Sequence, residues 1–193
     1  MHLLGGAAGP LGGDELRTRV HVEPGAHGTV RSVAATLVHP GPHGAPSNAS
    51  TDATIAAGAS LDWWPEPLVA IVGCYHTVRT HVAVEQGADV RWVDEMVGGR
   101  HDESAGSIVL HQRIELGGSP VLHHTVRPDW RPGNRVVVSG VWVGPPSGAS
   151  QTFLDTDVRA GRYALGPTAT AWVGVGDDLT DVRAALWDLG LRR

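Results

Sequence analysis

The sequence contains no lysine. All fifteen of its basic residues are arginine, and with twenty acidic residues the formal net charge is −5 at pH 7. No basic stripe stands out along the chain, which excludes the electrostatic pattern of a nucleic-acid-binding protein. Cysteine is almost absent as well, because Cys74 is the single example. One cysteine cannot form an internal disulfide, so a disulfide scaffold is excluded and a reducing compartment is favoured.

Signals for export and for membrane insertion are also missing. The opening MHLLGGAAGPLGG has neither a charged n-region nor a long apolar h-region. The most apolar segments, such as residues 68–74, are far too short to cross a bilayer. We therefore predict a soluble cytoplasmic protein with no membrane partner and no nucleic-acid partner.

No catalytic constellation is recognisable either. The glycine-rich opening lacks the Lys-Ser/Thr ending of a phosphate-binding loop. There is no GxSxG nucleophile elbow, and no expected helix carries a His-x-x-x-His metal pair. We therefore predict that the chain is not an enzyme and holds no tightly bound cofactor.

What the chain does contain is a repeat built on glycine turns. Each repeat has an aliphatic residue, two others, a glycine and a small residue, and then a strand-like alternation; the segments are residues 22–26, 55–59, 84–88 and 114–118. Their glycines, Gly25, Gly58, Gly87 and Gly117, are separated by 33, 29 and 30 positions. A glycine turn between two period-2 runs is typical of a β-hairpin, and a steady period is typical of stacked repeats. An ordinary β-sandwich is the alternative.

The remaining pattern agrees with an all-β fold that has one helix. Strands are predicted from β-branched content and alternation at residues 17–22, 29–38, 77–84, 90–97, 107–114 and 135–143. Residues 40–52 are predicted to be a polar, mobile loop. One helix is predicted from Leu179, Val182, Ala185, Leu186 and Leu189, with Asp177 or Asp178 as its N-cap and Gly190 as its stop. The predicted fold is therefore stacked antiparallel β-hairpins or solenoid-like sheets, with a C-terminal helix that covers an end or face of the stack.

Eleven histidines raise the question of a metal site. Cys74 and His76 are two positions apart on an expected strand and so would face the same side. A thiolate and an imidazole suit Ni, Zn or Cu, but two ligands do not close a site and a lone buried cysteine is common. His123 and His124 are adjacent, so on a strand they point to opposite faces and cannot chelate one ion.

The acidic pair Asp94 and Glu95 follows a tryptophan on a predicted strand. Adjacent carboxylates on a strand point to opposite faces, which excludes a glycosidase-type acid pair. We expect one of the two to face the interior, where a carboxylate needs a partner such as Arg100. The alternative is an edge charge or a structural ion pair.

Five blocks of sequence resemble, in order, the UreD family of urease accessory proteins, called UreH in some systems. The blocks are HLLGGAAGPLGGDEL with Gly12, Gly13 and Asp14, VEPGAHGTVRSVAAT, LDWWPEPLVAIVGC, WVDEMVGGR with Asp94, Gly99 and Arg100, and LHQRIELGGSPVLHH; the tryptophan-containing terminal helix also fits. Each block alone is a weak signal, but their order extends over nearly the whole chain. The chain begins closer to the Gly-Gly-Asp block than is usual for the family. The resemblance therefore implies a single domain over residues 1–193, and either the family's leading strands are absent or the start of the sequence is misassigned.

The resemblance implies a non-catalytic, β-rich scaffold that binds the helical protein UreF and, through it, the GTPase UreG. The complex docks on apo-urease, and nickel passes transiently through the scaffold's interior. Candidate residues for that passage are Asp94, Glu95 and Glu66. Gly12, Gly13, Asp14, Gly99 and Arg100 are then structural residues of the family motifs. Trp63 and Trp64 are candidate aromatic anchors for a partner, with core packing as the alternative for one of them.

Two other functions stay open from the residues alone. The first is another β-solenoid scaffold for metallocentre assembly, against which the single cysteine weighs. The second is a small cupin-like metal-dependent enzyme. It requires three or more histidine and acidic ligands converging at about 2.0–2.2 Å on one point.

Overall fold

The computed structural model describes residues 1–3, 9–144 and 147–192. The strands in chain order are β1 (His2–Leu3), β2 (Glu15–Val22), β3 (His27–Ser32), β4 (Thr36–Val38), β5 (Ser47–Ile55), β6 (Ser60–Trp63), β7 (Leu68–Ala70), β8 (Tyr75–Val84), β9 (Asp89–Gly98), β10 (Ser107–Leu116), β11 (Ser119–Val126), β12 (Val136–Val143), β13 (Gln151–Leu154), β14 (Val158–Ala164) and β15 (Ala169–Gly176). A 3-10 turn, η1 (Pro42–Gly44), and the α-helix α1 (Leu179–Asp188) complete the described elements.

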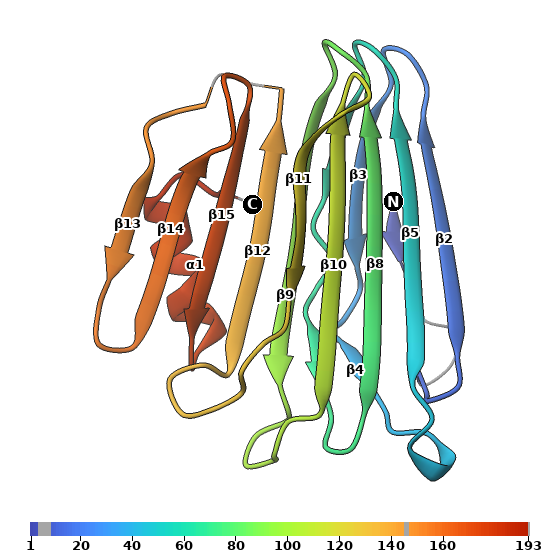
Figure 1. Ribbon diagram of the computed structural model, residues 1–193, viewed down its shortest axis with the longest axis vertical. Coiled ribbons are helices and arrows are strands. Elements are labelled where there is room, and N and C mark those ends of the chain that lie inside the picture. The colour runs from blue at the N-terminus through green and yellow to red at the C-terminus, as the bar shows by residue number, and fades with distance from the viewer. Residues whose placement is uncertain (4–8, 145–146, 193) are drawn as a thin grey trace.

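The strands form two sheets. The five-stranded sheet has the order β11-β10-β8-β5-β2, and the ten-stranded sheet follows β1-β3-β6-β9-β12-β15-β14-β13, with β4 and β7 paired beside it. In Figure 1 the five-stranded sheet lies in front of β9 and β3, while α1 lies behind β14 and β15. The all-β, solenoid-like fold with a C-terminal helix is thus confirmed. No helix in the described ranges is both long and apolar enough to cross a membrane.

The glycine turns carry the chain from one sheet to the other. Gly25, Gly58 and Gly87 have φ values of 70°, 71° and 82°, which a glycine adopts without steric cost. Each lies between a strand of the five-stranded sheet and a strand of the ten-stranded sheet, so strands of successive repeats pair in parallel. The prediction of an antiparallel hairpin within each repeat is therefore wrong for these three turns. Only at Gly117 do the flanking strands, β10 and β11, pair with each other as an antiparallel hairpin.

The C-terminal part is different, because β12, β15, β14 and β13 pair antiparallel. Helix α1 packs on them through Val182, Ala185 and Leu186, which join Val138 and Trp172 in one buried cluster. The carboxylate of Asp178 caps the helix by accepting hydrogen bonds from the backbone N–H groups of residues 180 and 181. The predicted helix, its cap and its role as a cover for a sheet face are confirmed.

Two local predictions are wrong. Residues 29–38 are not one strand, because β3 ends at Ser32 and β4 begins at Thr36. Residues 40–52 are not all loop: Ser47–Ile55 forms β5, which is paired on both sides by β2 and β8. Its polar residues misled the prediction, since they alternate between the solvent side and a partly polar interior. Only Ala53 and Ile55 give β5 the apolar contacts expected of a strand.

Candidate functional site

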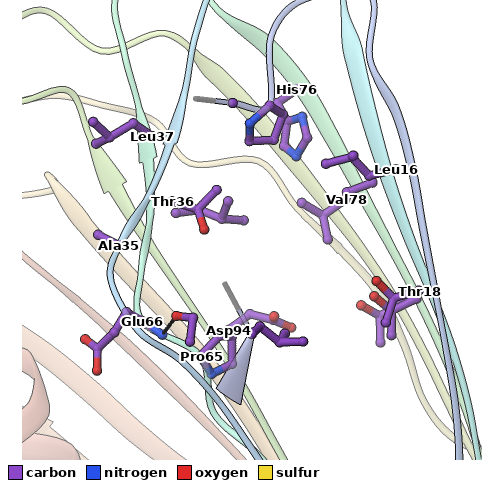
Figure 2. A pocket seen from close by; sticks show the side chains of 18 of the residues that line it. Leu16, Thr18, Ala35, Thr36, Leu37, Pro65, Glu66, His76, Val78 and Asp94 are labelled. Atoms are coloured by element: carbon purple, nitrogen blue, oxygen red, sulfur yellow. Dashed lines mark hydrogen bonds between the residues drawn. The ribbon is translucent and has the colours of Figure 1, made fainter. Parts of the chain in front are cut away.

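A cavity of about 470 Å³ lies between the two sheets. One wall is the inner face of β2, β5 and β8, and the opposite wall comes from the segment between β3 and β4 together with residues 65–68. Figure 2 shows Leu16, Thr18 and Val78 on the first wall, facing Ala35 and the segment that carries it. His76 and Asp94 lie toward opposite ends of the labelled set (Figure 2).

A row of polar side chains crosses the inner face of the five-stranded sheet. The register aligns Thr18 with Thr51, Thr51 with Thr80, Thr80 with Gln112, and Gln112 with His124. The three threonines line the cavity. Thr80 and Gln112 are buried, while Thr18 and His124, at the two edges of the sheet, are half-buried. The interior is therefore polar along one line that runs across the strands.

Asp94 faces this row from β9 on the other sheet. Its Oδ2 accepts hydrogen bonds from Trp92 Nε1 at 3.0 Å and from Gln112 Nε2 at 2.6 Å. Both donors are neutral, and Asp94 forms no ion pair with any described residue. Burial raises the pKa of Asp94 to about 6, although the two hydrogen bonds act in the opposite direction. Among the described residues, this interior carboxylate therefore has no cationic side chain to balance its charge.

Gln112 extends the network to two further strands. Its Oε1 accepts hydrogen bonds from Ser139 Oγ at 2.9 Å and from His124 Nε2 at 2.5 Å. Burial, and then the neighbouring His123, lower the pKa of His124. Asp94, Gln112, Ser139 and His124 thus join β9, β10, β12 and β11 in one buried polar cluster. The sequence pointed only to Asp94, because nothing local marks Gln112 or Ser139 as interior residues.

Glu95 points to the opposite face of β9, where α1 lies. Arg183 Nη2 donates to Glu95 Oε2 at 2.5 Å, Arg183 Nε donates to Oε1 at 2.9 Å, and Trp64 Nε1 donates to Oε1 at 3.0 Å. The same Arg183 lies 3.5 Å from the carboxylate of Glu66, a residue that also lines the cavity. The structure therefore separates the three candidate passage carboxylates: Asp94 and Glu66 border the cavity, and Glu95 anchors the helix.

The predicted partnership of Arg100 with the acidic pair is wrong. Arg100 Nε and Nη2 each donate to the carboxylate of Glu103 at 3.0 Å, on an exposed turn after β9. Gly99, with φ of 75°, reverses the chain at that turn, and a Cβ there would meet the carbonyl oxygen of residue 103 at 2.6 Å. Gly99 and Arg100 therefore contribute to the structure of their own loop.

The Gly-Gly-Asp motif, Gly12 to Asp14, also forms a turn. Residues 4–8, which belong to the same sequence block, lie outside the described residues. Asp14 Oδ2 accepts a hydrogen bond from the backbone N–H of Leu11 at 2.8 Å. A Cβ on Gly12 would clash with the backbone of Gly41 and Ala45, and Gly13 has φ of 100°. Through these residues the turn before β2 packs against the backbone on either side of η1.

Cys74 and His76 do not share a strand face. Cys74 ends the turn before β8, where burial raises the pKa of its thiol. His76 is on β8, lines the cavity and pairs through Nδ1 with Ser47 Oγ at 2.8 Å. Its Nε2 is buried without a hydrogen-bond partner among the described residues, and burial lowers its pKa to about 4. Residues 1–3, 9–144 and 147–192 contain no group of three or more His, Cys, Asp or Glu placed to hold a metal ion, so the cupin-like alternative loses its required site.

Trp63 and Trp64 are both buried, with exposed fractions of 5% and 3%. Trp63 points between the sheets and stacks on Trp92 with ring centroids 4.4 Å apart. Trp64 packs on the other face in the cluster that contains α1. Both tryptophan side chains are therefore packed in the core of this chain, which agrees with the alternative interpretation.

Known proteins give a consistent comparison. A UreD protein of Parafrankia is 38% identical over 195 residues, covering 97% of this chain and 63% of its own length. UreD proteins of Frankia alni and Frankia casuarinae are 41% and 40% identical over 61% and 60% of this chain, respectively. The chain spans 40% and 36% of the lengths of those two relatives. The family model described as UreD urease accessory protein matches residues 1–186. The chain therefore belongs to the UreD family of urease accessory proteins.

Proposed function

We propose that this chain is a non-catalytic scaffold of urease maturation through whose interior nickel passes to apo-urease. The observation that carries the proposal is the uncompensated carboxylate of Asp94 at the end of a cavity lined by a row of threonine hydroxyls. The charge of a buried carboxylate is costly without a counterion, so a cation that enters the cavity gains a site there. Family membership supports urease as the recipient.

The residues along the cavity suit transit of nickel as cargo, with no resident cofactor. Hydroxyl and carboxylate oxygens and an imidazole nitrogen are ligands that a borderline divalent cation accepts. They lie one after another along the row, so each position offers the ion few protein ligands and water supplies the others. Such weak, successive sites favour entry and release over storage.

The partners proposed are UreF, the GTPase UreG and the apo-urease subunits, in the cytoplasm. The sequence has no phosphate-binding loop, so GTP hydrolysis is assigned to UreG. The two outermost strands of the five-stranded sheet, β2 and β11, have a free edge in the described structure. Exposed apolar side chains include Leu154 at 77% and Trp187 at 49%. Free edges and exposed apolar residues support a docking role, and we expect poor solubility alone that improves when UreF is co-expressed.

Metal analysis of urease tests the proposal. In a strain that lacks this gene we expect urease protein to be present but poor in nickel, and the unmodified gene to restore its nickel content. Asp94→Asn should bind UreF normally and still fail to restore nickel. The matched control is Asp52→Asn, which changes an exposed carboxylate on the outer face of the five-stranded sheet. Fully nickel-loaded, active urease from the deletion strain would refute the proposal.

A further inference from the structure

The side-chain amide of Gln112, on β10, contacts residues from the three other strands of the cluster, β9, β12 and β11. Its Nε2 faces Asp94 Oδ2 at 2.6 Å, and its Oε1 faces Ser139 Oγ at 2.9 Å and His124 Nε2 at 2.5 Å. The side chain is 1% exposed. A buried amide with this many short contacts is held in one place by its neighbours.

The orientation of this amide is fixed by the chemistry of its partners. The NH₂ group donates to a carboxylate, and the carbonyl oxygen accepts from a hydroxyl and an imidazole N–H. The reversed amide would place its oxygen against the carboxylate oxygen of Asp94. The observed orientation also requires the proton of neutral His124 to be on Nε2, so the bond to Gln112 and metal binding at Nε2 exclude each other.

Gln112 also lies at the point where the cavity ends. Thr80 and Asp94, on one side of it, are among the cavity-lining residues. Ser139 and His124, on its other side, are not among them. Beyond Gln112 the polar row continues to half-buried His124 on the edge strand β11. The amide therefore separates the cavity from a second partly accessible end of the same row.

We propose that Gln112 is the gate of this passage, and that a divalent cation at Asp94 opens it by displacing the amide. This inference rests on the proposed nickel transit. The cation competes with Gln112 Nε2 for Asp94 Oδ2, which takes away the acceptor that the amide N–H has in the described part of the chain. Once the amide turns aside, Ser139 Oγ and, after its proton moves to Nδ1, His124 Nε2 become the next ligands along the row.

Thiol labelling tests the gate without urease. In the purified full-length protein carrying Cys74→Ala, a cysteine is placed beyond the gate by Ser139→Cys or before it by Thr80→Cys. A small neutral methanethiosulfonate should label Thr80→Cys at one rate with or without Mn²⁺, a divalent cation that prefers carboxylate oxygens to thiols. It should label Ser139→Cys slowly, and about ten-fold faster when Mn²⁺ is added. Adding Asp94→Asn should abolish that acceleration.

Two changes at the gate complete the test. Gln112→Ala should let Ser139→Cys react rapidly with or without Mn²⁺. Gln112→Met, which keeps the bulk but lacks the amide, should keep it slow in both conditions, and it also serves if the alanine variant fails to fold. A labelling rate of Ser139→Cys that either Mn²⁺ or Gln112→Ala leaves unchanged would overturn the gate, whatever the nickel content of urease in the deletion strain.

Discussion

The two sides of β9 hold adjacent carboxylates in contrasting surroundings. On the inner side, Asp94 is bonded to the neutral donors of Trp92 and Gln112. On the outer side, Glu95 is bonded to the guanidinium of Arg183 and to the indole of Trp64. Both residues are buried, so water cannot explain the difference.

The contrast shows how one strand can serve structure on one face and, in the function proposed above, transport on the other. A buried charge with a charged partner holds two elements together, here β9 and α1, and it loses stability when the partner is removed. A buried charge with neutral partners only orients the carboxylate and leaves its charge available to a cation. The neighbours of each carboxylate therefore distinguish the helix anchor, Glu95, from the carboxylate of the proposed passage, Asp94.

Removing the helix partner should have the largest effect. Arg183→Met leaves the carboxylate of Glu95, whose side chain is 0% exposed, without a cation. We expect the free energy of unfolding to fall by about 3 kcal/mol in a denaturant titration. Arg17→Met, on the exposed face of β2, is the control and should change it by less than about 0.5 kcal/mol. If the free energy of unfolding of Arg183→Met falls by less than about 1 kcal/mol, the hydrogen bond from Trp64 is sufficient to stabilise the buried carboxylate of Glu95.

The pH dependence of stability should separate Asp94 from His76. The folded-state pKa of Asp94, about 6, is above its ordinary 3.8, so its contribution to stability rises as pH falls from about 6 to about 4. The pKa of His76, about 4, is below its ordinary 6.5, so its contribution falls over the same range. Asp94→Asn removes the first effect and keeps the second.

Between pH 7 and pH 4 the unmodified chain should therefore gain up to about 3 kcal/mol of stability relative to Asp94→Asn. Denaturant titrations of both chains across this range measure the difference. If the two plots of unfolding free energy against pH stay parallel, burial does not shift the pKa of Asp94.

At neutral pH, Asp94→Asn should be tolerated, in contrast to Arg183→Met. The substitution removes an uncompensated buried charge, so we expect the stability to stay the same or to rise by about 1 kcal/mol. Thermal unfolding at pH 7.5 measures it. A clear loss of stability would indicate that the charge of Asp94 stabilises the fold, as that of Glu95 does.

The smallest effect is expected from the hydroxyl row. Thr51→Val removes one hydroxyl from the cavity at nearly constant volume, and we expect stability to change by less than about 1 kcal/mol. Urease activation in cells should fall measurably. Thr54→Val, on the outer side of the same strand, is the control and should leave activation unchanged. Equal urease activation by both variants would show that the threonine hydroxyls have no role in the proposed passage.

The sequence by itself determined the features that depend on neighbouring residues. The glycine period marked every turn between repeats, because glycine alone accepts a φ near 70° without strain. The cap and the spacing of apolar residues defined α1. The pleat of a strand was sufficient to predict that Asp94 and Glu95 point to opposite faces.

Only the tertiary structure decided what each of these side chains meets. Arg183 is 88 residues from Glu95, while Arg100, the partner chosen from proximity in sequence, is turned away by Gly99. The polar row exists because parallel register places Thr18, Thr51, Thr80 and Gln112 at one level, and no local pattern fixes register across repeats. Partners distant in the chain are selected by the packing of whole elements, so the cavity and the polar cluster on which the proposals rest form only when the sheets are assembled.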